Sequence, residues 1–466
     1  MRVLVLPWLL AACATSPSDK RPGDTGAAST DPSTTTPAGT TPAGSTPTGS
    51  TPAGTTPTGT TPTGTTPTGT TPTGTTPTGT TSTDPFEPEV DDEDAGSPGD
   101  PSDALFDDTV IHEVAITLSD DAAAALLDDG YTYVPGAVTV DGLSLALVGV
   151  RLRGKLGSYR ELDEKPKFKV DFNQYIPGQR LWGVETLTLN NSVADCSFMV
   201  EALGYYMFDQ LGVTASRLSF AHVTVNDLDY GLYQLVETQD DRYLAHHFTD
   251  TSGNLYDGKY VYDGGWSADT LDFVPEQWPL FQLEEGVDVG NEDVRLLTEA
   301  IRSSRRTPEF YATTGAFVDW PILHKFLAGE HWLDQWDGYA LNQNNYRFYF
   351  NPETGLAELL PFDLDLAMGG GFFFFSWSSP AGELAAECFD DPTCSAEHQA
   401  AVAAALDTLA AADIEARLTA WDALTLEAAM SDPRKECSNI GVTNARRDLF
   451  RNANGRDADL RDFWRL

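Results

Sequence analysis

Two aspartates, Asp363 and Asp365, stand within an otherwise apolar run at residues 359–366. Such a run predicts a buried strand, and burying an ionised carboxylate is costly unless the group is paired or holds a metal. If the strand alternates, both aspartates point to one face while Phe362 and Leu364 point to the other. The fold must therefore bring a cation to the end of this strand.

A second polar set lies just upstream, where Asn342 follows Asp337 by five residues and a predicted β-hairpin turns at residues 351–355. Phosphoryl transfer needs one aspartate to orient a hydroxyl nucleophile, and an asparagine and another aspartate to hold Mg²⁺ against the phosphates. The order of these residues matches the protein-kinase arrangement. We expect Asp337 to accept or orient the substrate proton. Asn342 and Asp363 would bind Mg²⁺, and Asp365 would be a second metal ligand or a structural partner.

An aspartate before a glycine is often only part of a turn, so Asp337 taken alone would more often be structural. The combination with Asp363 and Asp365 favours the functional interpretation. No Ser-His-Asp arrangement and no phosphate-binding G-x-x-x-x-G-K-[ST] motif occurs in the sequence.

Basic residues on a predicted strand are candidates for contacting nucleotide phosphates. Lys165, Lys167 and Lys169 are spaced two residues apart, and we expect Lys165 or, preferably, Lys169 to neutralise phosphate. A solvated strand face is the alternative. Glu237 ends an apolar strand and would pair with that lysine or contact the nucleotide, while Glu201 on a predicted helix is the rival partner.

Arg153 and Gly154 end another predicted strand. A glycine-containing turn lets backbone N–H groups approach a phosphate, so both residues are candidate nucleotide contacts. An ordinary exposed turn is an equally good interpretation of this pair.

Together these segments resemble the spore-coat CotH-type kinase family over roughly residues 105–370. The matching motifs, in order, are R-L-R-G (151–154), K-P-K-F-K (165–169), L-N-N with D-C-S (189–197), G-L-Y-Q-L-V-E (231–237), G-N-L-Y (253–256), D-G-Y with N-Q-N-N-Y-R (337–347) and P-F-D-L-D (361–365). The family usually has an arginine in the helix after D-x-S, where this chain has Met199, Val200 and Glu201. The resemblance implies an atypical protein kinase that uses ATP and Mg²⁺ to phosphorylate Ser or Thr of a protein substrate.

The periodicity of the chain predicts an α+β fold. Residues 105–240 would form a β-rich N-lobe with one helix, carried by residues 197–211, and residues 241–466 a mainly helical C-lobe. This is the plan of an atypical bilobal protein-kinase-like fold.

The N-terminus has the pattern of an export signal. Residues 1–13 place Arg2 before a short apolar run that ends in Leu-Ala-Ala-Cys13, which resembles a bacterial lipobox with Cys13 as the lipidated residue. Residues 14–104 follow as a disordered linker of Thr/Pro/Gly repeats and acidic residues. We expect an extracytoplasmic lipoprotein, held to the outer membrane or cell surface of a bacterium by its lipid alone. A short apolar start to a cytosolic protein is the alternative.

Net charge and cysteine content limit the kinds of partner and metal that we expect the protein to bind. With 70 acidic and 29 basic residues, the net charge of −41 argues against binding nucleic acid. Cys388 and Cys394 bracket a turn-rich segment that could close into a small disulfide ring, whereas the absence of a second cysteine pair or a paired histidine argues against zinc. Cys196 and Cys437 could be free or paired.

Two other functions fit the same sequence. One is a catalytically weak, kinase-like surface module that binds a structural or extracellular partner. The other is nucleotidyl transfer, with the nucleotide bound in reverse. The complete set of Asp337, Asn342 and Asp363 favours a kinase, whereas export favours the surface module because ATP is scarce outside the cytoplasm.

Overall fold

The computed structural model describes residues 99–155, 157–258, 261–262, 268–369 and 375–466, which all fall within one compact unit. Cys13 and the Thr/Pro/Gly repeats lie outside the described residues. None of the helices within the described part of the chain has the length and apolar character of a membrane span.

The first described element, the 3-10 helix η2 (Pro101–Ala104), belongs to residues that the sequence assigns to the linker. Asp100 caps it by accepting hydrogen bonds from the backbone N–H and hydroxyl of Ser102, and it also contacts His246 at 3.0 Å. Both Asp100 and Ser102 are buried. The folded part therefore begins before Leu105. Residues whose composition is typical of a linker form a capped helical turn here, with Asp100 as the cap.

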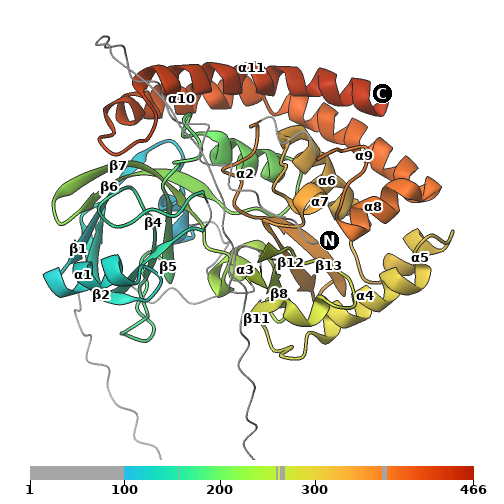
Figure 1. Ribbon diagram of the computed structural model, residues 1–466, viewed down its shortest axis with the longest axis horizontal. Helices are drawn as coiled ribbons and strands as arrows, with labels where there is room; N and C mark the ends of the chain where they lie inside the picture. Colours follow the sequence, from blue (N-terminus) through green and yellow to red (C-terminus); the bar gives the residue numbers. More distant parts are fainter. Residues whose placement is uncertain (1–98, 156, 259–260, 263–267, 370–374) are drawn as a thin grey trace, which may run out of the picture. The chain divides into compact units, whose positions relative to one another are not determined.

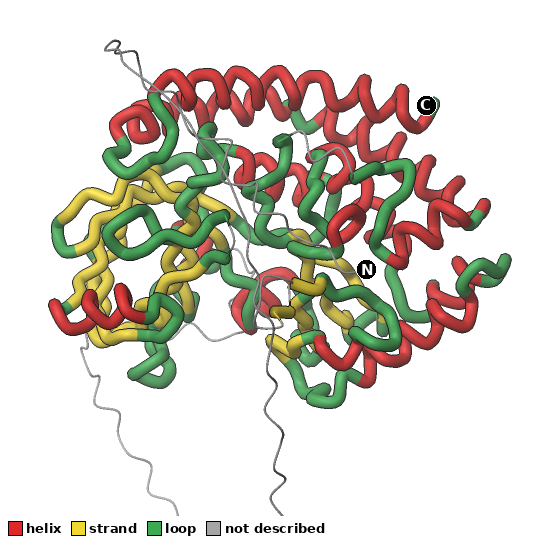
Figure 2. Tube along the Cα trace, in the orientation of Figure 1, coloured by secondary structure: helices red, strands yellow, loops and turns green. Residues whose placement is uncertain are grey.

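Seven strands close into a barrel in the order β1-β2-β3-β4-β5-β7-β6, shown in cyan to green in Figure 1 and in yellow in Figure 2. All neighbouring strands are antiparallel except β1 and β6, which are parallel. The strands are β1 (Ile111–Leu118), β2 (Val134–Val140), β3 (Leu143–Arg153), β4 (Lys167–Asp171), β5 (Thr186–Asn190), β6 (Leu218–Val225) and β7 (Leu228–Val236).

The two faces of β3 and β4 carry opposite chemistry. Leu152, Phe168 and their neighbours are fully buried in the apolar core of the barrel. Strand alternation sends the basic side chains to the other face, where Arg151 pairs in register with Lys169 and Arg153 with Lys167. This basic face frames the candidate site.

Besides α2 (Val200–Gln210), residues 105–240 contain the short Ala-rich helix α1 (Asp120–Asp128), which Ser119 caps. The carboxylate of Asp195 accepts backbone hydrogen bonds from Ser197, Met199 and Val200, and so caps the start of α2. The D-x-S motif thus fixes where this helix begins.

The remainder of the chain combines helices with a second sheet of four strands in the order β11-β8-β12-β13. The predicted hairpin is confirmed, because β12 (Tyr346–Asn351) pairs with β13 (Leu356–Pro361) across a turn that ends at Gly355. The other strands are β8 (Asn254–Asp257) and β11 (Gln282–Glu285), with the short pair β9 (Val261–Tyr262) and β10 (Ala268–Asp269). A sheet therefore sits within the region expected to be mainly helical.

Helices of this region pack on the sheet, on one another and on the barrel. In Figure 1, α10 lies against β7, and α11 lies against α6 and α9. The helices are α3 (Asp241–His247), η3 (Trp278–Leu280), α4 (Glu292–Ser304), α5 (Phe310–Thr314), α6 (Trp320–Leu333), α7 (Tyr339–Asn342), α8 (Glu383–Asp390), α9 (Pro392–Ala411), α10 (Ile414–Ser431) and α11 (Asn439–Trp464). The protein is a mixed α+β structure, as expected.

A buried ion pair and a disulfide are among the links between the C-terminal helices and the barrel. A buried ion pair connects Lys165, just before β4, to Asp432 at the end of α10. A disulfide connects Cys196, just before α2, to Cys437, just before α11, with Cα atoms 5.8 Å apart.

Candidate functional site

The loop between α6 and α7 holds Asp337 in a ring of amide donors. The side-chain NH₂ groups of Asn342 and Asn344 donate to one carboxylate oxygen at 2.6 and 3.2 Å, and that of Asn345 donates to the other at 3.0 Å. Asp337 is buried, with 7% of its surface exposed. The N-x-N-N pattern at residues 342–345 therefore orients this carboxylate.

A second carboxylate, Glu330 on α6, holds the backbone beside Asp337. Its two oxygens accept hydrogen bonds from the backbone N–H groups of Tyr339 at 2.7 Å and Ala340 at 2.9 Å. A Cβ atom at Gly338 would lie 2.1 Å from Glu330 Oε1, which explains the glycine after Asp337. Sequence reasoning missed Glu330, although a lone carboxylate in an apolar helix was a usable signal.

Asp363 and Asp365 converge on one buried lysine. Lys167 Nζ, from β4, lies 3.2 Å from Asp363 Oδ1 and 2.8 Å from Asp365 Oδ2. The strand expected over residues 359–366 ends at Pro361, so both aspartates occupy the loop beyond β13. Both carboxylates nevertheless point toward Lys167. The side chain of Leu364, between them in sequence, is buried in the apolar core.

The backbone at Asp363 has the left-handed φ of 47°, which is rare for a residue other than glycine. Its N–H donates to the hydroxyl of Tyr205 at 3.2 Å, and its carbonyl accepts from the side chain of Gln335 at 3.3 Å. Such strain persists only where the surroundings impose it, and it concentrates at functional sites.

Glu201 on α2 completes the cluster. Asn190 donates to Glu201 Oε2 at 2.7 Å, and Arg153 donates to the other end of the Asn190 amide at 3.2 Å. Glu201 Oε1 is buried and has no hydrogen-bond partner among the described residues. Burial and the charge of Asp363 raise the pKa of Glu201 to about 8, against the effect of Lys167.

Other carboxyl groups of the cluster are perturbed as well. Burial raises the pKa of Asp337 to about 6, and its amide donors oppose that shift. Burial alone would raise the pKa of Asp363, but Lys167 and Arg153 hold it below its ordinary value. The pKa of Asp365 is raised by burial and by the charge of Asp363.

The donor set fits a hard divalent cation. Glu201, Asp337, Asp363 and Asp365 bring carboxylate oxygens, which Mg²⁺ prefers, and Lys167 is the only lysine among the described residues that is ion-paired to any of them. Asp363 and Asp365 carry two negative charges against the one positive charge of Lys167, and a divalent cation beside them would neutralise the excess. Asn342 donates to Asp337 through its nitrogen, so it could face a cation only through its side-chain oxygen.

Two residues that were expected to contact the nucleotide, Lys165 and Glu237, have their hydrogen-bond and ion-pair partners outside the cluster around Lys167. Lys165 is engaged by Asp432 and by the carbonyls of Tyr230 and Leu232, so it is not available to phosphate. Among the described residues Glu237 is paired with no lysine; it pairs with Arg217 at 2.6 Å and with His247 at 3.0 Å.

Lys169 lies two residues from Lys167 on the same face of β4, half-buried and without an ion pair to any described residue. Lys167, not Lys169, meets the aspartates, because it is the residue nearest the β13 loop. Gly154 has a φ of +106°, and its carbonyl accepts a hydrogen bond from the hydroxyl of Tyr131, which supports a turn role for the glycine. Arg153 reaches the site through Asn190.

The four cysteines among the described residues form two pairs. The structure joins Cys388 to Cys394, with Cα atoms 5.0 Å apart, in addition to the link between Cys196 and Cys437.

Comparison with known proteins places the cluster within a family. The family model described as CotH kinase protein matches residues 150–439, which contain all of the cluster. Inner spore coat protein H of Bacillus subtilis (strain 168) is 28% identical over 220 residues, which make up 46% of this chain and 57% of that protein. The chain thus matches little more than half the length of this relative. The family model matches more than half of the residues of this chain, so the chain belongs to the CotH kinase protein family.

Proposed function

We propose that the protein is an ATP- and Mg²⁺-dependent protein kinase that transfers phosphate to Ser or Thr of a protein outside the cytoplasm. One observation carries the proposal: Asp337 and the Asp363/Asp365 pair, from two separate loops, converge with Lys167 in one buried cluster. Phosphoryl transfer is catalysed mainly by positioning and electrostatics, which such a cluster provides.

The phosphates would be bound from the basic face of the barrel. Lys167, with Lys169 and Arg153 beside it, supplies positive charge opposite the aspartates. Although burial opposes it, the charges of Asp363 and Asp365 raise the pKa of Lys167, so this ammonium stays protonated at neutral pH. Glu201 would orient the lysine from α2, as the pairing partner expected in a kinase.

Asp363 and Asp365 would hold Mg²⁺, with Asn342 as a further ligand. The metal would neutralise charge on the phosphates and polarise them for attack. The left-handed backbone at Asp363 aims its carboxylate back toward β4, which keeps both aspartates on one side of the loop.

Asp337 would act on the substrate hydroxyl. With a pKa raised to about 6, its carboxylate is ionised at neutral pH and can accept a proton. The three amide donors fix its orientation, and Glu330 fixes the backbone on which it stands. In this proposal the barrel with α2 acts as the N-lobe of a kinase-like pair of lobes, and the residues from α3 onward act as the C-lobe.

We further propose that the protein acts at the cell surface as a lipoprotein anchored through Cys13. The relative from Bacillus subtilis is named as a spore coat protein, which agrees with a location outside the cytoplasm. That name equally favours the second candidate, a catalytically weak module that binds a structural partner.

Mass spectrometry of the purified protein and candidate substrates after incubation with ATP and Mg²⁺ separates these functions. Added phosphate supports the kinase, added AMP indicates nucleotidyl transfer, and no addition favours the binding module.

Variants assign the residues. Asp363→Asn should lose Mg²⁺-dependent ATP binding in calorimetry, whereas Asp337→Asn should bind ATP and lose transfer. Asp128→Asn, on the exposed end of α1, is the matched control and should behave as wild type. Equal ATP affinity in wild type and Asp363→Asn would refute the metal assignment.

A further inference from the structure

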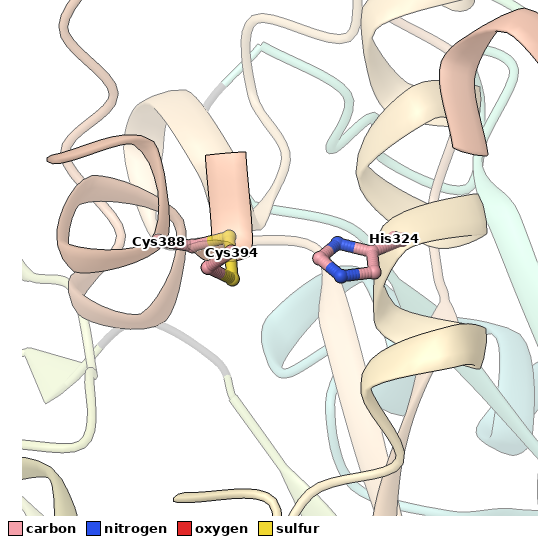
Figure 3. Close-up of side chains that lie close together, drawn as sticks. All are labelled: His324, Cys388 and Cys394. Carbon is pink, nitrogen blue, oxygen red and sulfur yellow. A yellow bond between two sulfur atoms is a disulfide. The ribbon is translucent and has the colours of Figure 1, made fainter. Parts of the chain in front are cut away.

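Four buried side chains from three helices gather where α6 and α8 pack on α9. His324 lies on α6, Cys388 on α8, and Cys394 and His398 on α9, each at most 3% exposed. Figure 3 shows the His324 ring facing the Cys388–Cys394 disulfide. His398 follows Cys394 by one helical turn, so the two share a face of α9.

Both histidines lack the hydrogen bonds that buried polar groups normally have. Neither ring nitrogen of His324 or of His398 has a partner among the described residues. The two rings lie 5.4 Å apart between centroids and are otherwise surrounded by aromatic side chains such as Trp320 and Phe389. Unsatisfied buried nitrogens are rare in native proteins, and each one calls for a ligand or another explanation.

We propose that His324, Cys388, Cys394 and His398 bind Zn²⁺ when the Cys388–Cys394 disulfide is reduced. Two thiolates and two neutral imidazoles are a common tetrahedral zinc set. The candidate ligand atoms of His324 and the two cysteines lie within 4.8 Å of one another. His398 lies outside this group of three, with its ring centroid 5.4 Å from that of His324, and would move inward to complete the set.

The expectation against zinc rested on spacing along the sequence, which does not show ligands that packing brings together. Cys388 and Cys394 have no histidine at finger-like spacing, because one ligand comes from α6 far upstream and the other from one turn further along α9. The sequence offers no way to see that α6 packs on α9, which is an extensive contact in the fold.

Metal uptake requires a balanced exchange. A thiol reductant breaks the Cys388–Cys394 bond; two of its thiols become one disulfide, and two electrons and two protons pass to the two cysteines. Zn²⁺ then displaces these two protons to solvent as it binds the thiolates. Because the metal binds only the reduced form, free Zn²⁺ at about 100 times its Kd should raise the thiol-to-disulfide ratio about 100-fold. That ratio corresponds to about 59 mV for a two-electron couple.

The test uses full-length protein, reduced without oxygen and titrated with Co²⁺. We expect one Co²⁺ per chain with the intense visible absorption of a tetrahedral thiolate site, displaced by Zn²⁺. Cys388→Ser with Cys394→Ser should abolish this spectrum, and His398→Gln should weaken or alter it. Cys196→Ser with Cys437→Ser is the matched control and should retain it.

A measurement without variants guards against misfolding. Peptide mapping of reduced wild type should show Zn²⁺ protecting Cys388 and Cys394, but not Cys196 and Cys437, from alkylation. Absence of the tetrahedral spectrum in reduced wild type, or equal alkylation of all four cysteines with and without Zn²⁺, overturns the proposal. Neither readout depends on kinase activity, so the zinc proposal is tested independently of the proposed function.

Discussion

Replacing Glu330 with glutamine should flatten the pH dependence of stability. Glu330 is 1% exposed, and burial raises its pKa to about 8 even though two backbone N–H groups lower it. A carboxyl group whose folded pKa exceeds its unfolded value contributes stability that is fully present below the unfolded pKa. That contribution is lost as the pH rises toward the folded pKa.

The magnitude follows from the two pKa values. From the ordinary value of 4.5 to about 8, the folded state binds one more proton than the unfolded state. Each pH unit in this window then removes about 1.4 kcal/mol of stability, so the group accounts for a fall of roughly 3 kcal/mol between pH 4.5 and pH 7. Glu330→Gln removes this titration. Because only one amide oxygen remains for two N–H groups, it also costs about 1–3 kcal/mol at low pH.

Urea unfolding of wild type and Glu330→Gln at several pH values between 4.5 and 8 provides the assay. The advantage of wild type in free energy of unfolding, about 1–3 kcal/mol at low pH, should fall by roughly 3 kcal/mol between pH 4.5 and pH 7, so that it vanishes or reverses. Glu330→Ala removes both acceptors and should be the least stable of the three proteins at pH 5. A constant difference between wild type and Glu330→Gln across the whole range would show that Glu330 does not titrate in this window, and the argument would fail.

Three further predictions test other parts of the molecule. Burial raises the pKa of Asp337 to about 6 from 3.8, and a base must be ionised, so the transfer rate with saturating Mg²⁺-ATP should rise with pH to a plateau above about 6; a midpoint near pH 4 would contradict this. Asp432→Asn should lower the free energy of unfolding by about 3–5 kcal/mol, because it leaves the Lys165 ammonium buried without its carboxylate. Adding Lys165→Met should recover part of that loss in the same denaturation assay, and a single variant as stable as wild type would be inconsistent with it. Cys13→Ala should move the protein from the membrane to the soluble fraction, and unchanged membrane association would exclude lipid anchoring through Cys13.

Local pattern was enough to predict the parts of the site that are close in sequence. The spacing from Asp337 to Asn342 predicted one loop, and these side chains are hydrogen-bonded to each other. The hairpin before Asp363 follows from its turn residues and alternation, and its two strands pair as predicted. Strand period also placed Lys167 and Lys169 on one face.

How deeply each side chain is buried, and by which partner, could not be predicted from local pattern. Alternation assigns a face to Lys167 and Lys169, but which of them is buried depends on where the loop after Pro361 meets β4. Lys165 has the same spacing and a different role, because its partner Asp432 is 267 residues away. The strand was predicted too long for a related reason: tertiary contacts such as the Tyr205 hydroxyl impose the left-handed backbone at Asp363.

The disulfide between Cys196 and Cys437 spans 241 residues and encloses most of the proposed catalytic machinery in one covalent ring. A protease that cuts once between these cysteines would leave the two pieces joined until the sulfurs are reduced. During synthesis the ring cannot close until Cys437 has been made, so the chain segment with Asp337 and Asp363 must be complete before it is locked. The protein should therefore tolerate nicks in its long central region while remaining sensitive to thiols.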